Sequence, residues 1–479
     1  MKPLRYVINL WSSFGTVAII SKVWEKYFIN KYRFRLNCNR IVPEFPIRQK
    51  PYDFLHNTKS FIQDKPINIC YLIHCFFPDK NGGTEQFVLN LAKEQQRLGN
   101  HVRILTLGNH ELKFYSKQYK DIFFNDFQFE GLDVTQFRYR HIPRGYYYDE
   151  IYNNEPNMAA FAAMYLDKYK VNLVHAVYPQ PFATFLGVCL KQCIPYVITT
   201  TDFNIICHYA TLVDKRGQFC KHSRKGERCE ECCKTYGLKD PRTRYHRASD
   251  LLQRAEFVTA PSEFVARVLE SEFQQVSVTV VPHGISSVFS CFKKREQTKR
   301  FSYVGILSEL KGVHLLISVF MRLDDSRLSL DIYGDGEQNY INRLKNMAEN
   351  DSRIKFHGGV SSSHIVKVYQ NSDCVVIPSL WFETYNFVLR EALACGCLVI
   401  ASNIGAMPEP IYEGENGFLF TPGNDEELFQ KLQASLHFNW SLYRTSSFPV
   451  PKQEGERYAL IYAHALKSKT KEFSEDVSK

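Results

Sequence analysis

The 479-residue sequence lacks a long apolar run of the kind that crosses a membrane. Two uncharged stretches, at residues 6–21 and 171–190, contain Asn together with Gly or Pro, whereas a spanning helix needs about 20 mainly apolar residues. The basic start MKPLRY is not followed by a compact apolar segment with a small-residue cleavage site. We therefore expect no transmembrane helix, no cleavable signal peptide and a cytoplasmic location.

Acidic residues are in deficit, and the cysteines are unevenly spread. The sequence has 50 Asp and Glu against 60 Lys and Arg, a net charge of +10 that favours an anionic partner. Nucleic acid, an anionic membrane surface and a diphosphate all fit that sign.

Five of the 14 cysteines lie between positions 207 and 233, and most others stand among apolar residues. In a reducing cytoplasm we expect no disulfides. A hydrophobic fraction of 44% excludes a disordered chain.

Strand and helix patterns alternate along the chain in two series. The first begins with a buried strand at 68–74, a helix at 84–98 and a strand at 102–107. The second begins at Phe301, after the polar, basic stretch 292–300. Such alternation predicts parallel sheets covered by helices, with ligands at the carboxyl ends of the strands. We predict an α/β protein of two doubly wound, Rossmann-like domains facing each other across a cleft.

These patterns also divide the chain. We place an N-terminal extension at 1–65, a first domain at 66–283 with a Cys-rich insert at 203–240, a second domain at 284–447, and a helical tail at 448–479. The extension contains an amphipathic, basic and aromatic helix at 7–28. Such a helix can lie on the inner face of an anionic membrane or pack on the body of its own protein, and both interpretations stay open.

Residues 378–409 contain the pattern that points most directly to a ligand. A strand ends at Pro378, a loop follows, and a helix begins near Tyr385 or Asn386. The first amides of a helix have no partner within it and lie at the positive end of its dipole. We therefore expect a diphosphate to bind against Thr384, Tyr385 and Asn386.

Two carboxylates flank this expected anion site. Glu383 lies just before the helix and Glu391 about two turns along it, so they are roughly ten ångströms apart at about 1.5 Å per residue. That separation suits the two ends of one elongated ligand better than a shared metal ion. Carboxylates accept hydrogen bonds from sugar hydroxyls. The spacing is therefore typical of a site for a nucleotide sugar.

This stretch resembles the signature of glycosyltransferase family 4. In that signature Pro-Ser is followed by two Glu separated by seven residues, and the second Glu begins the run Glu-Ala-x-Ala-x-Gly. Here Pro378-Ser379 precedes Glu383, and Glu391 begins the run at residues 391–396. The resemblance implies a GT-B fold and retention of the anomeric configuration. It also implies that Glu383 contacts donor-sugar hydroxyls and that Glu391 holds the nucleotide ribose.

Three further segments are similar to this family. The run from Gly305 to Lys311 resembles its glycine, arginine and lysine loop, although Ile306 stands where the family often has Arg. The resemblance implies that Lys311 neutralises the leaving diphosphate. Gly82 and Gly83 resemble the loop that approaches the donor phosphates. Finally, Asp202 matches an acidic strand end at which Thr201 replaces the usual His.

We predict an enzyme that transfers a hexosyl unit from a nucleoside-diphosphate sugar to a glycan or lipid-linked acceptor, as in bacterial polysaccharide assembly. We expect no nucleic-acid partner and no catalytic cofactor. The sequence has no Asp-x-Asp pair for a divalent ion at the donor, so Lys311 and the helix start would act on the diphosphate. Asp202 is the candidate group nearest the acceptor. The alternative is a degenerate, non-catalytic member that binds a glycan or a protein.

The Cys-rich insert allows a structural zinc site. Cys229 and Cys232 have the spacing of one half of a tetrahedral site, and Cys207 and Cys220 would complete it. Free thiols and redox pairing are the alternatives.

Overall fold

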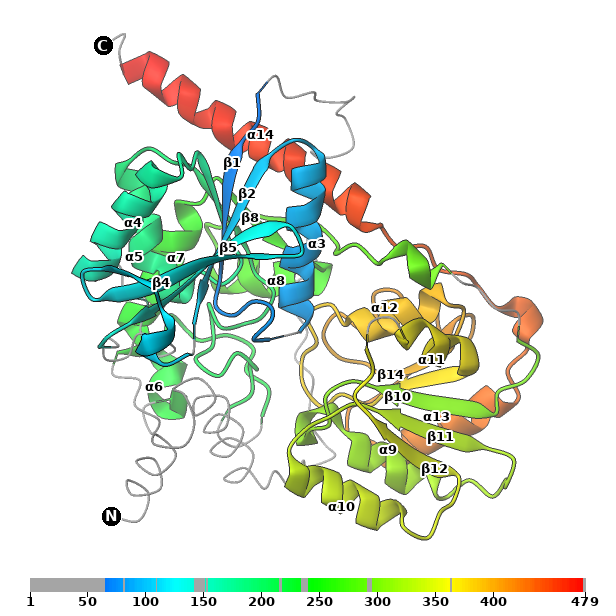
Figure 1. The fold of residues 1–479 in the computed structure, drawn as a ribbon. Helices are drawn as coiled ribbons and strands as arrows, with labels where there is room; N and C mark the ends of the chain where they lie inside the picture. Colours follow the sequence, from blue (N-terminus) through cyan, green and yellow to red (C-terminus); the bar gives the residue numbers. More distant parts are fainter. Residues whose placement is uncertain are drawn as a thin grey trace.

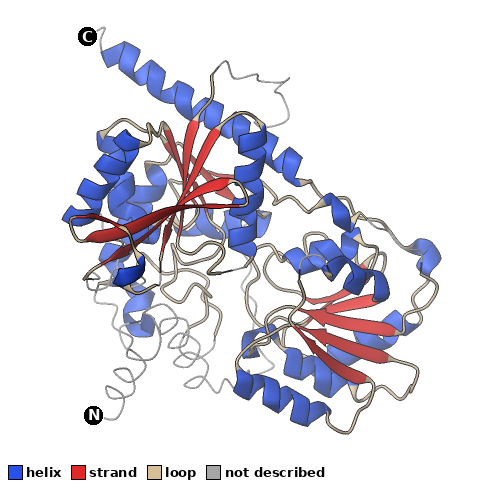
Figure 2. Cartoon of the chain, in the orientation of Figure 1, coloured by secondary structure: helices blue, strands red, loops and turns tan. Residues whose placement is uncertain are grey.

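The computed structural model describes residues 65–80, 82–108, 110–141, 151, 154–214, 218–233, 240–290, 295–361 and 364–476. The helix expected at 7–28 lies outside the described residues. Two separate sheets, each flanked by helices, form two lobes joined by crossing segments (Figures 1 and 2). The predicted α/β architecture is confirmed. In the part of the chain that the structure describes, no helix is long and apolar enough to span a bilayer.

The N-terminal sheet has nine strands in the order β3-β4-β5-β2-β1-β6-β7-β8-β9. From β5 to β9 neighbouring strands pair in parallel, whereas β3–β4 and β4–β5 are antiparallel. The strands are β1 (Asn68–Ile73), β2 (His101–Leu107), β3 (Lys117–Tyr119), β4 (Ile122–Phe129), β5 (Leu132–Tyr139), β6 (Leu173–Ala176), β7 (Tyr196–Thr199), β8 (Phe257–Ala260) and β9 (Val278–Val280).

The helices of this lobe connect the parallel strands and cover both faces of the sheet (Figure 1). They are α3 (Gly83–Arg97), α4 (Pro156–Lys168), α5 (Ala183–Lys191), α6 (Glu227–Cys233), α7 (Pro241–Gln253) and α8 (Glu263–Glu272), with short 3-10 turns η2 (Leu112–Phe114) and η3 (Gln180–Phe182). A further turn, η5 (Ser287–Phe289), follows the first crossing segment and packs against α12 (Phe387–Ala394) of the second lobe. Helix starts follow ordinary capping chemistry: the side chain of Ser262, for example, accepts a hydrogen bond from the third amide of α8.

The C-terminal sheet has six parallel strands in the order β12-β11-β10-β13-β14-β15. Helices α9, α10 and α13 cover one face, and α11 and α12 cover the other (Figure 1). The elements are β10 (Arg300–Val304), η6 (Glu309–Lys311), α9 (Val313–Phe320), β11 (Ser329–Tyr333), α10 (Gln338–Ala348), β12 (Ile354–Gly358), α11 (Ile365–Asn371), β13 (Cys374–Ile377), α12 (Phe387–Ala394), β14 (Leu398–Ser402), β15 (Gly417–Phe420), α13 (Asp425–Leu436) and η7 (Trp440–Leu442).

The sequence analysis missed the antiparallel edge of the first sheet. It placed no element between the strands at 102–107 and 172–177, where the structure has β3, β4, β5 and α4. Strands β4 and β5 form a hairpin whose two turn residues, Glu130 and Gly131, both have positive φ angles of 48° and 82°. This turn conformation matches the right-handed twist of paired strands.

The C-terminal helix α14 (Pro451–Asp476) belongs structurally to the N-terminal lobe. It leaves the second lobe and runs along α3 and the first sheet (Figure 1). Tyr458 and Tyr462 are fully buried in the same core cluster as β1 and α3. The Tyr462 hydroxyl lies 3.0 Å from that of Tyr71 and 2.7 Å from His175 Nδ1. The chain therefore crosses between the lobes twice.

Arg295 fastens the end of α12 to the sheet. Its buried guanidinium donates to the carbonyls of Tyr369 and Ser372, at the end of α11, and to those of Cys395 and Gly396, just after α12. These carbonyls lie at the ends of α11 and α12, and a cation suits the negative end of a helix dipole.

We predict that Arg295→Met lowers the free energy of unfolding by about 3 kcal/mol, because it removes four buried hydrogen bonds from a charged donor. Chemical denaturation followed by circular dichroism measures the change. Arg327→Met is the control, since Arg327 is exposed and pairs only with the neighbouring Asp325. Equal stability of the two variants would contradict the role given to Arg295.

Candidate active site

Glu383 is the most firmly held side chain of the predicted site. Its Oε1 atom lies 2.6 Å from Lys311 Nζ and accepts hydrogen bonds from Ser379 Oγ at 2.7 Å and Trp381 Nε1 at 2.9 Å. Burial acts to raise the pKa of Glu383, but the Lys311 ammonium and these donors outweigh it and lower the pKa below its ordinary value. Glu383 is therefore a fixed, ionised carboxylate with its cation beside it.

Close backbone contacts set the position of this pair. A Cβ on Gly312, which has a φ of +69°, would lie 2.0 Å from the carbonyl oxygen of Pro378. A Cβ on Gly405 would lie 2.4 Å from the carbonyl oxygen of Glu383. Only glycine fits at either position. The loop after β10 and the loop after β13 thus meet at the carboxyl end of the second sheet, which brings Lys311 to Glu383.

The start of α12 differs in part from the expected anion site. Asn386, with a φ of +61°, caps the helix, and its side-chain oxygen accepts from the amide of Leu389 at 2.9 Å. The Tyr385 side chain is buried, and its hydroxyl donates to the carbonyl of His283 at 2.6 Å. Tyr385 can therefore offer a ligand only its backbone, and the asparagine cap already occupies one first-turn amide.

Glu391 lies on α12, facing α11. Its Oε2 accepts a hydrogen bond from Tyr369 Oη at 2.8 Å. Removal from water raises the pKa of Glu391 to about 7, and the bond from Tyr369 lowers it only in part. Near neutral pH a ligand hydroxyl therefore meets either protonation state of this carboxyl.

The glycines expected near the donor phosphates lie where two backbones approach. A Cβ on Gly83 would lie 3.3 Å from the ring of Phe387, the first residue of α12, so the start of α3 faces the start of α12. Gly82 is the N-cap of α3. Gly305 follows β10 with a φ of +142°, and a Cβ on Gly334 would lie 1.8 Å from its carbonyl oxygen.

A chain of hydroxyl contacts crosses from one lobe to the other beside Glu383. Thr84 Oγ1 lies 3.2 Å from Thr201 Oγ1, and Thr384 Oγ1 donates to the Thr201 carbonyl at 2.8 Å. Ser262 Oγ donates to the Thr384 carbonyl at 2.7 Å. The structure thus brings the first-lobe loops at Thr84 and Thr201 to the residue next to Glu383.

Asp202 follows Thr201 at the carboxyl end of β7. Its Oδ1 accepts from the amide of Asn204 at 2.8 Å. Removal from water raises the pKa of Asp202 to about 6, although that amide acts in the opposite direction. The carboxyl lies on the first-lobe side of the site.

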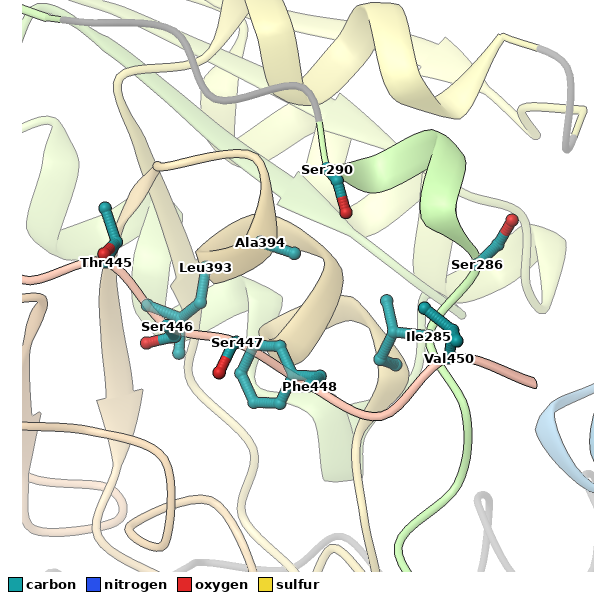
Figure 3. Close-up of a pocket in the computed structure, with 10 residues that line it drawn as sticks. All are labelled: Ile285, Ser286, Ser290, Leu393, Ala394, Thr445, Ser446, Ser447, Phe448 and Val450. Carbon is teal, nitrogen blue, oxygen red and sulfur yellow. The ribbon is translucent and has the colours of Figure 1, made fainter. Parts of the chain in front are cut away.

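One cavity of about 210 Å³ lies away from these residues. It is lined by the segments that cross between the lobes and by the end of α12 (Figure 3). The lining residues are Ile285, Ser286, Ser290, Leu393, Ala394, Thr445, Ser446, Ser447, Phe448 and Val450. None of the predicted donor-site residues is among them, so this cavity is not the donor site.

Two family models match adjacent parts of the chain. The model described as "Glycosyltransferase Family 4" matches residues 81–288, and that described as "Glycosyl transferases group 1" matches residues 289–443. The chain belongs to glycosyltransferase family 4. It is a transferase, and its two Rossmann-like lobes form the GT-B fold.

The sequence of this glycosyltransferase is similar to parts of several curated relatives. It is 33% identical over 138 residues to a sulfoquinovosyl transferase of Arabidopsis thaliana, covering 28% of this chain and 26% of the relative. It is 35% identical over 131 residues to D-inositol 3-phosphate glycosyltransferase of Corynebacterium glutamicum, covering 26% and 31%. The match to lipopolysaccharide 1,2-N-acetylglucosaminetransferase of Salmonella typhimurium is 24% identical over 203 residues and covers 37% and 52%. The chain thus spans between about a quarter and a half of these relatives.

Solved structures agree in fold. Sucrose-phosphate synthase from Thermosynechococcus elongatus matches with a TM-score of 0.58 and 18% identity, covering 86% of this chain and 99% of that one. Anabaena HepE, solved with UDP and glucose, matches with a TM-score of 0.54 and 16% identity, covering 86% and 100%. At these identities the likeness concerns the fold alone.

The sequence analysis missed three partners of the two family glutamates. Ser379 and Trp381 stand in the same loop as Glu383, and their donor groups four and two residues before it were a usable signal. Tyr369, the partner of Glu391, comes from α11 and had no signal in the sequence, because only the packing of α11 beside α12 joins them.

The structure does not support the predicted zinc site. In the described ranges no group of three or more His, Cys, Asp or Glu side chains is arranged to hold a metal ion. Cys207, Cys229 and Cys232 pack against the buried ring of Tyr209. Cys220 lies close enough to Cys207 and Cys229 for their charges to interact, and burial raises the pKa of both Cys207 and Cys220.

We predict that nucleotide affinity depends on the charge of Glu391. Because its pKa is raised to about 7, the carboxylate that we expect to accept ribose hydroxyls is largely protonated below that pH. Affinity should therefore become up to about tenfold weaker as the pH falls from about 8 to about 6. Calorimetric titration with UDP, GDP and ADP measures this. Glu391→Gln should bind weakly at both pH values, and a pH slope that persisted in it would assign the effect to another group.

Proposed function

We propose that this family 4 enzyme transfers a hexosyl unit from a nucleoside-diphosphate sugar to a glycan or lipid-linked acceptor, with retention, as in bacterial polysaccharide assembly. The observation that supports it most is the Lys311–Glu383 pair in front of α12, with Glu391 further along the same helix. Anabaena HepE, which shares the fold, is solved with UDP and glucose. A starch synthase IV from Arabidopsis thaliana, also of this fold, is solved with ADP and acarbose.

Each charged residue has a separate task in this proposal. Glu383 accepts hydrogen bonds from donor-sugar hydroxyls, and Lys311 neutralises the diphosphate as the bond between the anomeric carbon and the phosphate oxygen breaks. The acceptor oxygen bonds to the anomeric carbon from the same face, and its proton passes to the departing phosphate oxygen or to Asp202. Because Lys311 already lies beside Glu383, the site needs no rearrangement of charge before the donor arrives.

A non-catalytic role is the second candidate. Ile306 stands where the family often has Arg, and Thr201 where it often has His. The Ile306 side chain carries no charge and is 65% exposed. Hydrolysis or transfer of a donor sugar distinguishes an enzyme from a binding protein, because a binding protein releases no nucleoside diphosphate.

We predict that one sugar nucleotide in a panel of UDP-, GDP- and ADP-sugars raises the melting temperature of the full chain, since a ligand of the folded state stabilises it. Lys311→Ala should lose most of this shift. Glu383→Ala should keep its fold, judged by circular dichroism, and lose transfer by at least about a hundredfold. Lys345→Ala, on the exposed side of α10, is the control for removing a positive charge. Full activity of Glu383→Ala would falsify the donor-site assignment.

We also predict that Ile306→Arg increases donor turnover by about tenfold, because it adds a second cation near the leaving diphosphate. The site is exposed, so the change should not alter the melting temperature without ligand. Release of nucleoside diphosphate, measured by a coupled assay, reports the rate, and Ile306→Gln controls for loss of the apolar side chain. An unchanged rate in Ile306→Arg would mean that a different group already supplies the second charge.

A further inference from the structure

A buried polar contact between two side chains lies where the chain first crosses between the lobes. His283 and Glu454 are 3% and 1% exposed, and His283 Nδ1 lies 2.9 Å from Glu454 Oε1. The second carboxylate oxygen accepts from the amide of Gly284 at 2.8 Å. Glu454, in the first turn of α14, therefore fastens the first crossing segment to the second.

The other side of His283 faces the donor helix. Its carbonyl accepts from the hydroxyl of Tyr385, and its ring stacks on that of Phe387 at 5.5 Å between centroids and 4° between planes. Tyr385 and Phe387 flank the cap residue of α12. His283 also lies 4.2 Å, between ring centroids, from Phe87 of α3. One residue thus contacts α3, α12 and α14.

The two ends of α12 are packed differently. At its beginning Phe387 lies between His283 and Gly83, where a Cβ would approach the ring to 3.3 Å. Near its end, Leu393 and Ala394 border the cavity of about 210 Å³ between the crossing segments (Figure 3). The close packing of Phe387 between His283 and Gly83 makes the His283 contact a point that fixes where α12 begins.

A further contact keeps the hinge backbone close to α14. A Cβ on Gly284 would lie 2.5 Å from the nitrogen of Pro451, the first residue of α14. The two crossing segments therefore touch through backbone atoms at the same place where Glu454 binds His283. The crossing segments and α12 thus share contacts at this one place.

We propose that His283 is a positioning residue for the donor site, acting through Tyr385 and Phe387, and that Glu454 of α14 holds it in place. The order of the loop and helix over residues 380–394 then depends on the docking of the beginning of α14. The coupling stands on the contacts above, and only its effect on the donor rests on the proposed function.

Hydrogen exchange of the full chain without ligand tests the coupling. His283→Ala and Glu454→Ala should raise amide exchange over residues 380–394 by about tenfold, because each removes a buried partner of the other. Tyr462→Phe is the matched control. Tyr462 lies on the same helix as Glu454, and the change removes its hydroxyl, which contacts Tyr71 and His175 and not His283. Amide exchange over residues 380–394 should therefore stay unchanged.

Glu454→Gln keeps the proposal testable if Glu454→Ala does not fold. Its amide oxygen can still accept from the Gly284 amide, so its exchange over 380–394 should lie between those of the wild type and His283→Ala. Wild-type exchange over 380–394 in His283→Ala, or an equal rise in Tyr462→Phe, would overturn the coupling, since the contact would then be ordinary packing.

Kinetic measurements with the sugar-nucleotide donor distinguish failure of this inference from failure of the proposed function. With the sugar nucleotide that shifts the wild type, His283→Ala and Glu454→Ala should raise the donor KM by about tenfold at temperatures where both are folded, and Tyr462→Phe should not. If no sugar nucleotide binds the wild type, the proposed function fails while the exchange result still decides the coupling. An unchanged KM in both variants despite faster exchange would overturn the positioning role.

Discussion

The buried pair of Lys311 and Glu383 is the constraint around which the second lobe is arranged. A carboxylate taken out of water needs a cation and hydrogen-bond donors close by. Lys311, Ser379 and Trp381 supply them, all converging on the same carboxylate oxygen. Bringing these groups from two loops to one point requires backbone approaches that only glycine allows, at Gly312 and Gly405. Gly312 and Gly405 are thus needed because the loops that bring Lys311 to the Glu383 carboxylate pass so close to each other at the end of the sheet.

The same loop also joins the two lobes. Phe382 stacks on Phe264 of α8 at 5.3 Å between ring centroids and lies 4.6 Å from Phe219 of the Cys-rich insert. Thr384 bonds to Thr201 and Ser262 on either side. Apolar contact before Glu383 and hydrogen bonds after it therefore fix the carboxylate relative to the first lobe. The insert contributes an aromatic ring to this arrangement, with no metal arrangement among its described residues.

Elements with a strong local pattern could be predicted, and elements defined by their partners could not. The strand at Cys374–Ile377 and the helix after Asn386 follow from apolar periodicity, a capping residue and a terminal glycine. Strand β3 has only three residues, KQY, and β4, IFFNDFQF, does not alternate between apolar and polar residues, so neither has a clear strand pattern. The four cysteines have zinc-like spacing, but spacing along a loop does not determine where side chains point.

The sequence alone determined the two-lobed fold, because alternating apolar segments specify the sheets, and it predicted Glu383, Glu391 and Lys311 as donor-site residues from their resemblance to the family's motifs. Only the tertiary structure decided which other side chains set the pKa and the position of those residues. Tyr369 reaches Glu391 from another helix, and Glu454 reaches His283 across 171 positions of sequence. Such contacts leave no local pattern, because they arise when whole elements pack, and burial then sets charge and position through groups far apart along the chain.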